Sequence, residues 1–518
     1  MASKKKTFQF FPILLSIILA FTYTFILANP LDLTNSDIGR HLINGREILQ
    51  QHWEILFKNT YSYTMPDQSF VNHHWLAGVI FWLSYQLNGF LALHIFHTII
   101  LLIFLLTLFY LLSKKSSWST GFLLSLLAIV FLATRVEVRP ESFGFLLLTI
   151  YLLVIHHLNK TKQVKLSSFL IITITQLIWV NLHISFVFGL FVFGLFTLIE
   201  LTINKTFNQK NKKKLIILLV TLCLTSLFNP NTIQGALSPF TIFQDYGYKV
   251  YENQNLWFLR NYYRGPILPL FYLIAGIIIT LLFIFPEIAL FEKALAVTGI
   301  FLGWSALRNI PIFVIFTFPF LALALQQTFS YLKTKITFEE PKLTKFIVIT
   351  IPLVLLWLSL ASNPYFQKKA QGFQFGLLKQ QPETLSFLAK IPPKARIFNN
   401  YDVGSALVFS LYPENKVFVD NRPEAYSSSF FQDLYIPAQS SELTWKKADE
   451  KYDFNFIIFG HRDITPWAQI FIKNRLRDNL WKIIYIDDFI FIFAKDTPEN
   501  KPLIDQYAIE VPLSRLKF

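Results

Sequence analysis

The sequence contains little charge and almost no sulfur. Asp, Glu, Lys and Arg account for 15% of its 518 residues, and hydrophobic residues account for 53%. Soluble domains carry about 25% charged residues, so this composition excludes an ordinary water-soluble protein. The single cysteine, Cys223, excludes an intrachain disulfide and a metal site built from several cysteines.

Long apolar runs explain this composition. A transmembrane helix needs about 20 mostly apolar residues, and we predict a polytopic α-helical membrane protein with about eleven such helices. The predicted spans are residues 8–28, 89–112, 117–133, 141–158, 166–183, 185–204, 214–228, 267–285, 289–306, 309–325 and 344–361. The first span is longer than the apolar core of a signal peptide, so we expect it to stay uncleaved. A shorter apolar stretch after His74 is expected to be interfacial or re-entrant.

The positive charge is arranged as it is in membrane proteins. A formal net charge of +15 would also suit nucleic acid, but the lysines lie in short runs between the apolar spans. Such runs mark the cytoplasmic side of a membrane. They contain Lys114, Lys115, Lys160, Lys162, Lys165, Lys205, Lys210, Lys212, Lys213, Lys214, Lys333, Lys335, Lys342 and Lys345. The pattern predicts a multi-pass protein of the cell membrane with a cytoplasmic N-terminus, an extracytoplasmic C-terminal domain and no binding to nucleic acid.

The chain changes character after residue 361. Residues 1–362 are predicted to form the transmembrane domain, with a long first outer loop at 29–89, and residues 363–518 a soluble extracytoplasmic α/β domain. Its β-rich runs are 395–398, 416–419, 456–459, 482–486 and 489–494, with a final hairpin turning at Asp487-Asp488. Asp420-Asn421-Arg422 is interpreted as a turn held by side-chain hydrogen bonds or, less favourably, as a ligand contact.

The first outer loop is too long for a simple connection, which is typical of a functional loop. Residues 36–50 are predicted to form a helix whose spacings of three and four put polar side chains on one face. This polar stripe contains Asp37, Arg40, His41, Asn44 and Glu47. Ser36 is the expected N-cap, with Asp37 in the first turn. The stripe is either a solvated face of an interfacial helix or, in the preferred interpretation, a catalytic site with Asp37 as its carboxylate.

The predicted topology gathers further arginines, histidines and acids on the outer face. They include His73, His74, Arg135, Glu137, Arg139, Glu141, His183 and Arg308. The guanidinium fork suits phosphate, so the outer face is predicted to bind a lipid-linked phosphate. Three alternatives stay open. Arg135, Glu137 and Arg139 are also consistent with mutual neutralisation, His183 with a polar cap on a span, and Arg308 with snorkelling to the interface.

An ordered series of short motifs resembles the GT-C superfamily of integral membrane glycosyltransferases, particularly its bacterial branch related to dolichyl-phosphate-mannose and arabinose-transferring enzymes. The series begins in the first outer loop and continues along nearly the whole chain. Its members are Asp37-Ile-Gly-Arg-His41-Leu, Gly45-Arg46-Glu47-Ile-Leu, Tyr61-Ser62-Tyr63-Thr64, His73-His74-Trp75-Leu76, Arg139-Pro140, Trp179-Val-Asn181-Leu-His183, Asn229-Pro230, Leu307-Arg308, Phe398-Asn-Asn-Tyr401 and Phe418-Val-Asp420-Asn-Arg422.

This resemblance implies an inverting hexosyl or pentosyl transferase that uses a polyprenyl-phosphate-linked sugar. The family's catalytic acid in the first outer loop would be Asp37, acting as general base. His41 and His74 would orient groups or relay protons. The implied substrate-binding residues are Arg40, Glu47, Arg135, Glu137, Arg139, His183 and Arg308, with Arg139 and Arg308 on the phosphate. The acceptor is left open among a glycan, a lipid and a protein.

Two departures from the family pattern weaken the case for a divalent metal. Many relatives have a doubled acid before the helix, whereas Asp32 and Asp37 stand five residues apart here. Where relatives can carry an acid late in the loop, this chain has His74. Hard cations prefer several carboxylates, so a divalent metal has little support and no other cofactor is predicted.

Two other classes compete with an enzyme. A transporter or lipid flippase would place charges near the membrane midplane and often repeats its two halves, and neither feature is evident in the sequence. A scaffold would use the membrane part only as an anchor, for which so many spans are unnecessary.

Overall fold

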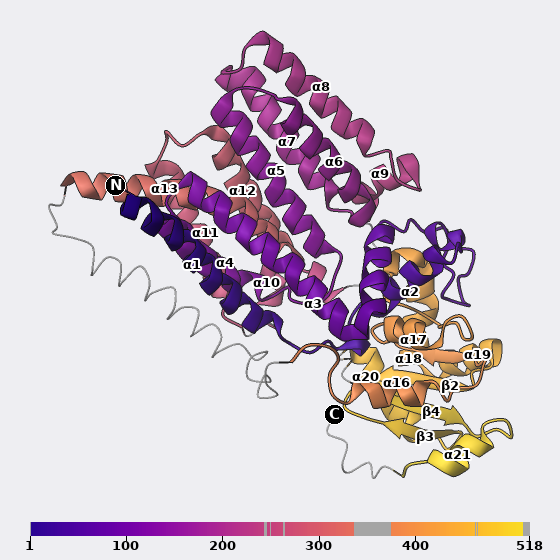
Figure 1. Cartoon of the computed structure of the whole chain (residues 1–518). Helices are drawn as coiled ribbons and strands as arrows, with labels where there is room; N and C mark the ends of the chain where they lie inside the picture. The colour runs from indigo at the N-terminus through magenta and orange to yellow at the C-terminus, as the bar shows by residue number, and fades with distance from the viewer. Residues whose placement is uncertain are drawn as a thin grey trace. The chain divides into compact units, whose positions relative to one another are not determined.

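The computed structural model describes residues 2–242, 246–248, 250–262, 265–335, 374–461, 463 and 465–510. The chain divides into two compact units. We call the first the helical unit (Met1–Asn29, Ile95–Phe228 and Val250–Phe375) and the second the mixed unit (Pro30–His94, Asn229–Lys249 and Gly376–Phe518). Figure 1 shows the elements of both units in chain order by colour.

The helical unit consists of apolar helices, as the sequence predicts. They are α1 (Ala2–Leu27), the second part of α3 (Trp75–Lys115), α4 (Trp118–Leu132), α5 (Glu141–Thr161), α6 (Leu166–Leu182), α7 (Phe186–Ile199) with its continuation η3 (Glu200–Asn204), α8 (Gln209–Thr225), α10 (Leu256–Leu259), α11 (Ile267–Ile284), α12 (Leu290–Ser305) and α13 (Ile310–Lys335). Short turns η4 (Tyr251–Asn253) and η5 (Leu307–Asn309) lie between them. Ten predicted spans fall largely on these helices, whereas 344–361 lies outside the described residues.

In the part of the chain that the structure describes, five helical stretches are long and apolar enough to cross a membrane. They are Trp75–Lys115, Glu141–Thr161, Phe186–Asn204, Ile267–Ile284 and Leu307–Tyr331. The chain is therefore a multi-pass membrane protein, and the number of spans stays a prediction.

Small residues let α12 and α13 approach closely. A Cβ atom on Gly299 would lie 2.8 Å from the Cβ of Phe316, and one on Gly303 would lie 2.7 Å from the Cβ of Phe313. Apolar packing between helices has no hydrophobic driving force in lipid, so close approach through glycines supplies the van der Waals contact.

The helix α3 is broken within the mixed unit, a few residues before the chain passes into the helical unit at Ile95. Asn88 and Gly89 depart from helical geometry, and Gly89 has φ of +57° and ψ of −147°. The part before this break, Trp75–Leu87, includes the stretch predicted to be interfacial or re-entrant, and its relation to the bilayer stays a prediction.

The mixed unit contains a four-stranded sheet in the order β1-β2-β4-β3. Its strands are β1 (Ile397–Asn399), β2 (Phe456–Gly460), β3 (Trp481–Ile486) and β4 (Ile490–Lys495). The β1 and β2 strands are parallel, and β4 is antiparallel to both β2 and β3. The predicted final hairpin is confirmed. The predicted strand at 416–419 is wrong, because this segment contributes only an isolated bridge between Val417 and Ser62.

Helices surround this sheet. They are α16 (Gln381–Leu388), α17 (Gly404–Leu411), α18 (Ile436–Ser440), α19 (Glu442–Tyr452), α20 (Pro466–Arg475) and α21 (Lys501–Tyr507). The first outer loop adds η1 (Leu33–Asn35), α2 (Ile38–Leu49) and η2 (Trp53–Leu56), and residues 229–249 add α9 (Thr232–Thr241). Residues 30–94 thus fold with the C-terminal segment, whereas the predicted boundary at residues 362 and 363 lies outside the described residues.

The helix α2 lies against α17 (Figure 1). A Cβ on Gly39 would stand 2.3 Å from the carbonyl oxygen of Ser405 in α17, and one on Gly45 would stand 2.1 Å from that of Gly78 in α3. The polar stripe is therefore buried: Arg40, His41, Asn44 and Glu47 are all at most 6% exposed. The interpretation of a solvated face is wrong for these four residues, because neighbouring backbone replaces water around the helix.

Adding a methyl group to α2 should destabilise the mixed unit. We expect Gly39→Ala and Gly45→Ala to lower the midpoint of thermal unfolding, because the new Cβ meets backbone that cannot rotate away; overpacking costs about 1–3 kcal/mol. Helix propensity alone would favour alanine and would raise the midpoint of thermal unfolding instead. The control is Gly276→Ala in α11, where a Cβ meets no atom within 4 Å. Equal midpoints for Gly39→Ala and wild type would contradict this packing.

Candidate active site

Asp37 stands at the N-terminal end of α2. The helix begins at Ile38, and Asp37 has φ of −78° and ψ of −6° without capping α2 through its side chain. The Ser36 hydroxyl is buried and has no hydrogen-bond partner among the described residues. The prediction that the Ser36 side chain caps the helix is therefore wrong. The Asp37 carboxylate, which is 25% exposed, makes its contacts with other side chains.

Asn421 from the C-terminal segment holds this carboxylate. The Asn421 amide nitrogen Nδ2 donates a hydrogen bond to Asp37 Oδ1, and Arg40 Nε donates to Asn421 Oδ1 at 3.1 Å. The guanidinium of Arg40 also lies 3.5 Å from Asp37 Oδ2. The three side chains form one closed network, in which Asn421 holds the Asp37 carboxylate and the Arg40 guanidinium in a defined orientation.

A buried ion pair holds Asn421 in place. Arg422 donates from Nε and Nη2 to the two carboxylate oxygens of Asp420, each at 2.7 Å, and both side chains are fully buried. Arg422 Nη2 also donates to Asn59 Oδ1 at 2.7 Å, and the Tyr426 hydroxyl donates to Asp420 Oδ2 at 3.2 Å. The preferred interpretation of a turn held by side chains is confirmed for Asp420 and Arg422, whereas Asn421 between them contacts the candidate acid.

Two further acids interact with Asp37 or with its partner Arg40, and sequence reasoning did not find them. Burial, with the like charges of Asp463 and Asp37, raises the pKa of Asp402 to about 7. Burial also raises the pKa of Glu424, and the guanidinium of Arg40 opposes that increase. Asp402 directly follows the motif Phe398-Asn-Asn-Tyr401, which was the available signal. A carboxyl group with a raised pKa thus lies near the N-terminal end of α2.

The two histidines predicted to be catalytic lie together. The rings of His41 and His74 have centroids 5.3 Å apart in an edge-to-face arrangement, and the ring of His73 lies 4.1 Å from that of His74. His41 is 1% exposed and one helical turn after Asp37, whose carbonyl oxygen accepts its backbone N–H at 3.3 Å. Among the described residues, no group of three His, Cys, Asp or Glu side chains has the geometry of a metal site.

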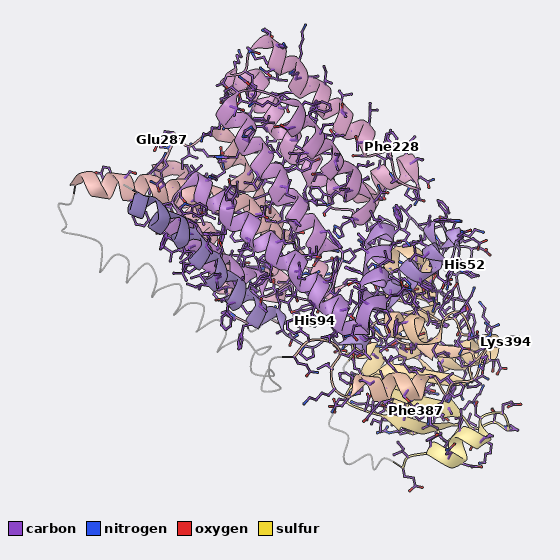
Figure 2. The ribbon with its side chains drawn as sticks, viewed as in Figure 1. His52, His94, Phe228, Glu287, Phe387 and Lys394 are labelled. Atoms are coloured by element: carbon purple, nitrogen blue, oxygen red, sulfur yellow. The ribbon has the colours of Figure 1, made fainter. Side chains whose placement is uncertain are left out.

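Glu47 belongs to a different place from Asp37. It stands at the C-terminal end of α2, where Arg46 Nε donates to Glu47 Oε1 at 2.9 Å and His52 Nδ1 lies 2.7 Å from Glu47 Oε2. The structure therefore separates the predicted stripe into two sites, one at each end of the helix. Figure 2 labels His52, which is exposed at the surface of the mixed unit.

In the helical unit, the predicted arginines are largely engaged with acids. Arg135 contacts Glu141 and Glu252 at 2.6 Å, and Arg139 contacts Glu137 and Glu252 at 2.8 Å. Burial raises the pKa of Glu252, but Arg135, Arg139 and Arg308 together bring it below its usual range. Mutual neutralisation is therefore confirmed for these ion pairs, and Glu252 is a member that the sequence did not reveal.

Arg308 and His183 are held differently. Among the described residues Arg308 forms no ion pair and donates one hydrogen bond, from Nη1 to Asn253 Oδ1 at 3.0 Å. Its remaining donors leave it the strongest candidate for a phosphate. His183 Nδ1 accepts the backbone N–H of Ser185 at 3.1 Å and lies 2.6 Å from its hydroxyl. This contact at the junction of α6 and α7 favours the interpretation of a polar cap.

The fold is similar to those of solved GT-C membrane glycosyltransferases. This confirms the predicted fold class. No family model matches the sequence, and no curated protein matches it.

Three solved structures illustrate the likeness in fold. The archaeal oligosaccharyltransferase AglB from Archaeoglobus fulgidus, in complex with an inhibitory peptide and a dolichol-phosphate, aligns over 95% of this chain and 75% of its own, with a TM-score of 0.60 and 12% identity. ArnT from Cupriavidus metallidurans in the apo state aligns over 96% of this chain and 99% of its own, with a TM-score of 0.54 and 12% identity. The arabinofuranosyltransferase AftD from Mycobacteria aligns over 93% of this chain and 41% of its own, with a TM-score of 0.50 and 11% identity.

Removing the Asp402 carboxylate should change how stability depends on pH. The pKa of the Asp402 carboxyl group is about 7 in the folded protein, whereas its ordinary value is 3.8. The folded state therefore binds more protons than the unfolded state between these two pH values, and stability falls as the pH rises from the lower to the higher. We expect Asp402→Asn to gain stability over wild type across this range, by at most about 4 kcal/mol, and to keep a constant gain above pH 7. Thermal unfolding of the purified protein at several pH values measures this.

The matched control for this measurement is Asp433→Asn, which removes an exposed carboxylate from the same unit. Its difference from wild type should stay flat between pH 4 and pH 8. A flat difference for Asp402→Asn as well would show that Asp402 titrates as an ordinary surface acid.

Proposed function

We propose that this protein is a membrane glycosyltransferase that moves a sugar from a polyprenyl-phosphate donor to an acceptor on the extracytoplasmic face. The observation that carries the proposal is the Asp37 carboxylate, oriented by Asn421 and Arg40 in a chain with the GT-C fold. The proposed topology has a cytoplasmic N-terminus and an extracytoplasmic C-terminal domain, in agreement with the lysine pattern.

Asp37 is the proposed general base. The acceptor hydroxyl transfers its proton to the Asp37 carboxylate as its oxygen bonds to the anomeric carbon, and the bond from that carbon to the phosphate oxygen breaks. The lipid phosphate leaves with the electron pair of the broken bond. Asn421 and Arg40 hold the carboxylate, and His41 and His74 are proposed to orient the reacting groups around it.

Arg308 is the proposed ligand of the lipid phosphate. Its guanidinium has donors beyond the single bond to Asn253, whereas Arg135 and Arg139 already contact carboxylates. A bidentate guanidinium can stabilise the charge that grows on a leaving phosphate. We keep Arg135, Glu137 and Arg139 as supporting residues that balance charge, and Arg40, Glu47 and His183 as proposed substrate-binding residues.

Asp37→Asn should express normally and lose sugar transfer. Asparagine keeps the size of the side chain and removes the proton acceptor, and general-base catalysis contributes about 100- to 10,000-fold. The measurement is transfer of labelled sugar from a panel of polyprenyl-phosphate sugars by membranes containing each variant. Asp67→Asn, which changes an exposed acid in the same loop, is the control and should keep wild-type transfer. Wild-type transfer by Asp37→Asn would refute its role as base.

Arg308→Ala should weaken binding of polyprenyl phosphate by about tenfold or more, since a charge-assisted hydrogen bond contributes about 1.5–3 kcal/mol. Binding of a fluorescent polyprenyl phosphate to the purified protein measures this directly. Arg260→Ala is the matched control, because Arg260 is an exposed arginine of the helical unit that stacks on Trp257. Unchanged affinity in Arg308→Ala would remove Arg308 from the phosphate site.

A further inference from the structure

A cavity of about 750 Å³ opens beside the C-terminal end of α2. Residues of the mixed unit alone line it, from the segment 46–60 and from Tyr412 and Pro413. Its volume lies in the range of small-molecule sites, which is about 300–1,000 Å³. Of the residues that line this cavity, the proposed reaction uses only Glu47, as a substrate-binding residue, and the cavity lies at the opposite end of the helix from Asp37.

One wall of the cavity offers an aromatic surface and several amides. Trp53 is 53% exposed although it is a large apolar side chain, and the exposed residues Gln50 and Gln51 precede it closely. Gln51 has φ of +68°, a conformation that usually belongs to glycine at the end of a helix. The chain thus places a long amide side chain where a glycine would relieve strain, and such strain collects at binding sites.

One guanidinium and two carboxylates line the cavity, and they are partly paired with one another. Arg46 Nη2 donates to the Tyr412 carbonyl oxygen at 3.0 Å and lies 2.8 Å from Glu47 Oε1. The remaining oxygen of Glu47 lies 2.7 Å from His52 Nδ1, and Glu54 adds one more carboxylate. Arg46 is the only arginine among the described residues that line the cavity, and it is already engaged, which disfavours a phosphate or another anion. A lipid chain is also disfavoured, because amides and carboxylates form much of the wall.

A neutral saccharide matches these features. The face of a sugar ring presents C–H groups that pack on an indole, and its hydroxyls both donate and accept, as primary amides and carboxylates require. Glu47 and Asp37 are ten residues apart on one helix, which is about 15 Å at 1.5 Å per residue. A single sugar unit cannot reach across this distance, so a ligand that serves both ends of α2 is an oligosaccharide.

We propose that this cavity is a saccharide subsite that binds the remote part of a neutral oligosaccharide acceptor, with Trp53 as its stacking platform. The assignment of the ligand as the acceptor rests on the proposed function, whereas the cavity's affinity for saccharides does not. Among the three acceptor classes left open by the sequence, the proposal selects a glycan.

The test is saturation-transfer NMR with the full-length protein in nanodiscs and three neutral trisaccharides, namely maltotriose, mannotriose and N-acetylchitotriose. We expect at least one trisaccharide to bind, and Trp53→Ala to weaken its binding about tenfold, or about 1.4 kcal/mol. Trp53→Phe keeps an aromatic face and should retain most of the affinity. Trp257→Ala is the matched control, since Trp257 is 59% exposed in the helical unit and lies outside this cavity.

Three results would overturn the subsite. They are no binding of any of the three trisaccharides, equal binding by Trp53→Ala and wild type, and an equal loss in Trp53→Ala and Trp257→Ala. Quenching of the Trp53 fluorescence by brominated lipid, obtained as the difference between wild type and Trp53→Ala, would instead assign this surface to the bilayer.

The Asp37→Asn variant separates the subsite from the proposed reaction. It should bind the trisaccharide as wild type does, because Asp37 lies at the other end of α2. Trisaccharide binding that requires Trp53, in a protein that transfers no sugar from any donor, would refute the reaction and leave the subsite. Transfer that requires Asp37, without any trisaccharide binding, would refute the subsite alone.

Discussion

The mixed unit depends on the close approach of α2 to its neighbours. Gly39 and Gly45 bring the α2 backbone against the carbonyl groups of Ser405 and Gly78, at distances that exclude any side chain. This contact joins the first loop to the C-terminal segment and removes water from a helix with a polar face. Burial of polar groups is costly unless each finds a partner, so the packing of these two glycines dictates the hydrogen bonds around the helix.

Those partners come from segments that are distant in the sequence. Ser405 accepts the backbone N–H of Arg40, Tyr61 donates to Asn44 at 2.6 Å, and Asn421 bonds both Asp37 and Arg40. The buried pair of Asp420 and Arg422 is weak evidence for stability, because desolvation offsets much of its attraction. Its geometric effect is clearer, since it holds the backbone on both sides of Asn421 and thereby fixes the carboxylate that Asn421 contacts.

Local sequence patterns made the helices predictable. The contacts between distant segments, which form the candidate site, could not be predicted from these patterns. Apolar length located the described spans, and the spacing of Asp37, Arg40, His41 and Glu47 located α2. Spacing reports which face a residue shares and carries no information about what covers that face, so the burial of α2 and the role of Asn421 were not predictable. The same limit applies to Asp402 and Glu252, because the charged groups that shift their pKa values are distant in the sequence. At 416–419 a β-rich pattern failed, because only Val417 pairs and the segment instead bonds to the first loop.

The two ends of α2 differ in charge, and the difference assigns them different chemistry. Near Asp37, Asp402 interacts with both Asp37 and Asp463, and Glu424 interacts with Arg40, the cation in contact with Asp37. The like charges of these acids repel a phosphate, so the charge of the leaving group must be neutralised elsewhere. That task requires cations outside this network. At the other end, Glu47 contacts Arg46 and His52, and the neighbouring amides of Gln50 and Gln51 suit hydroxyl groups rather than proton transfer.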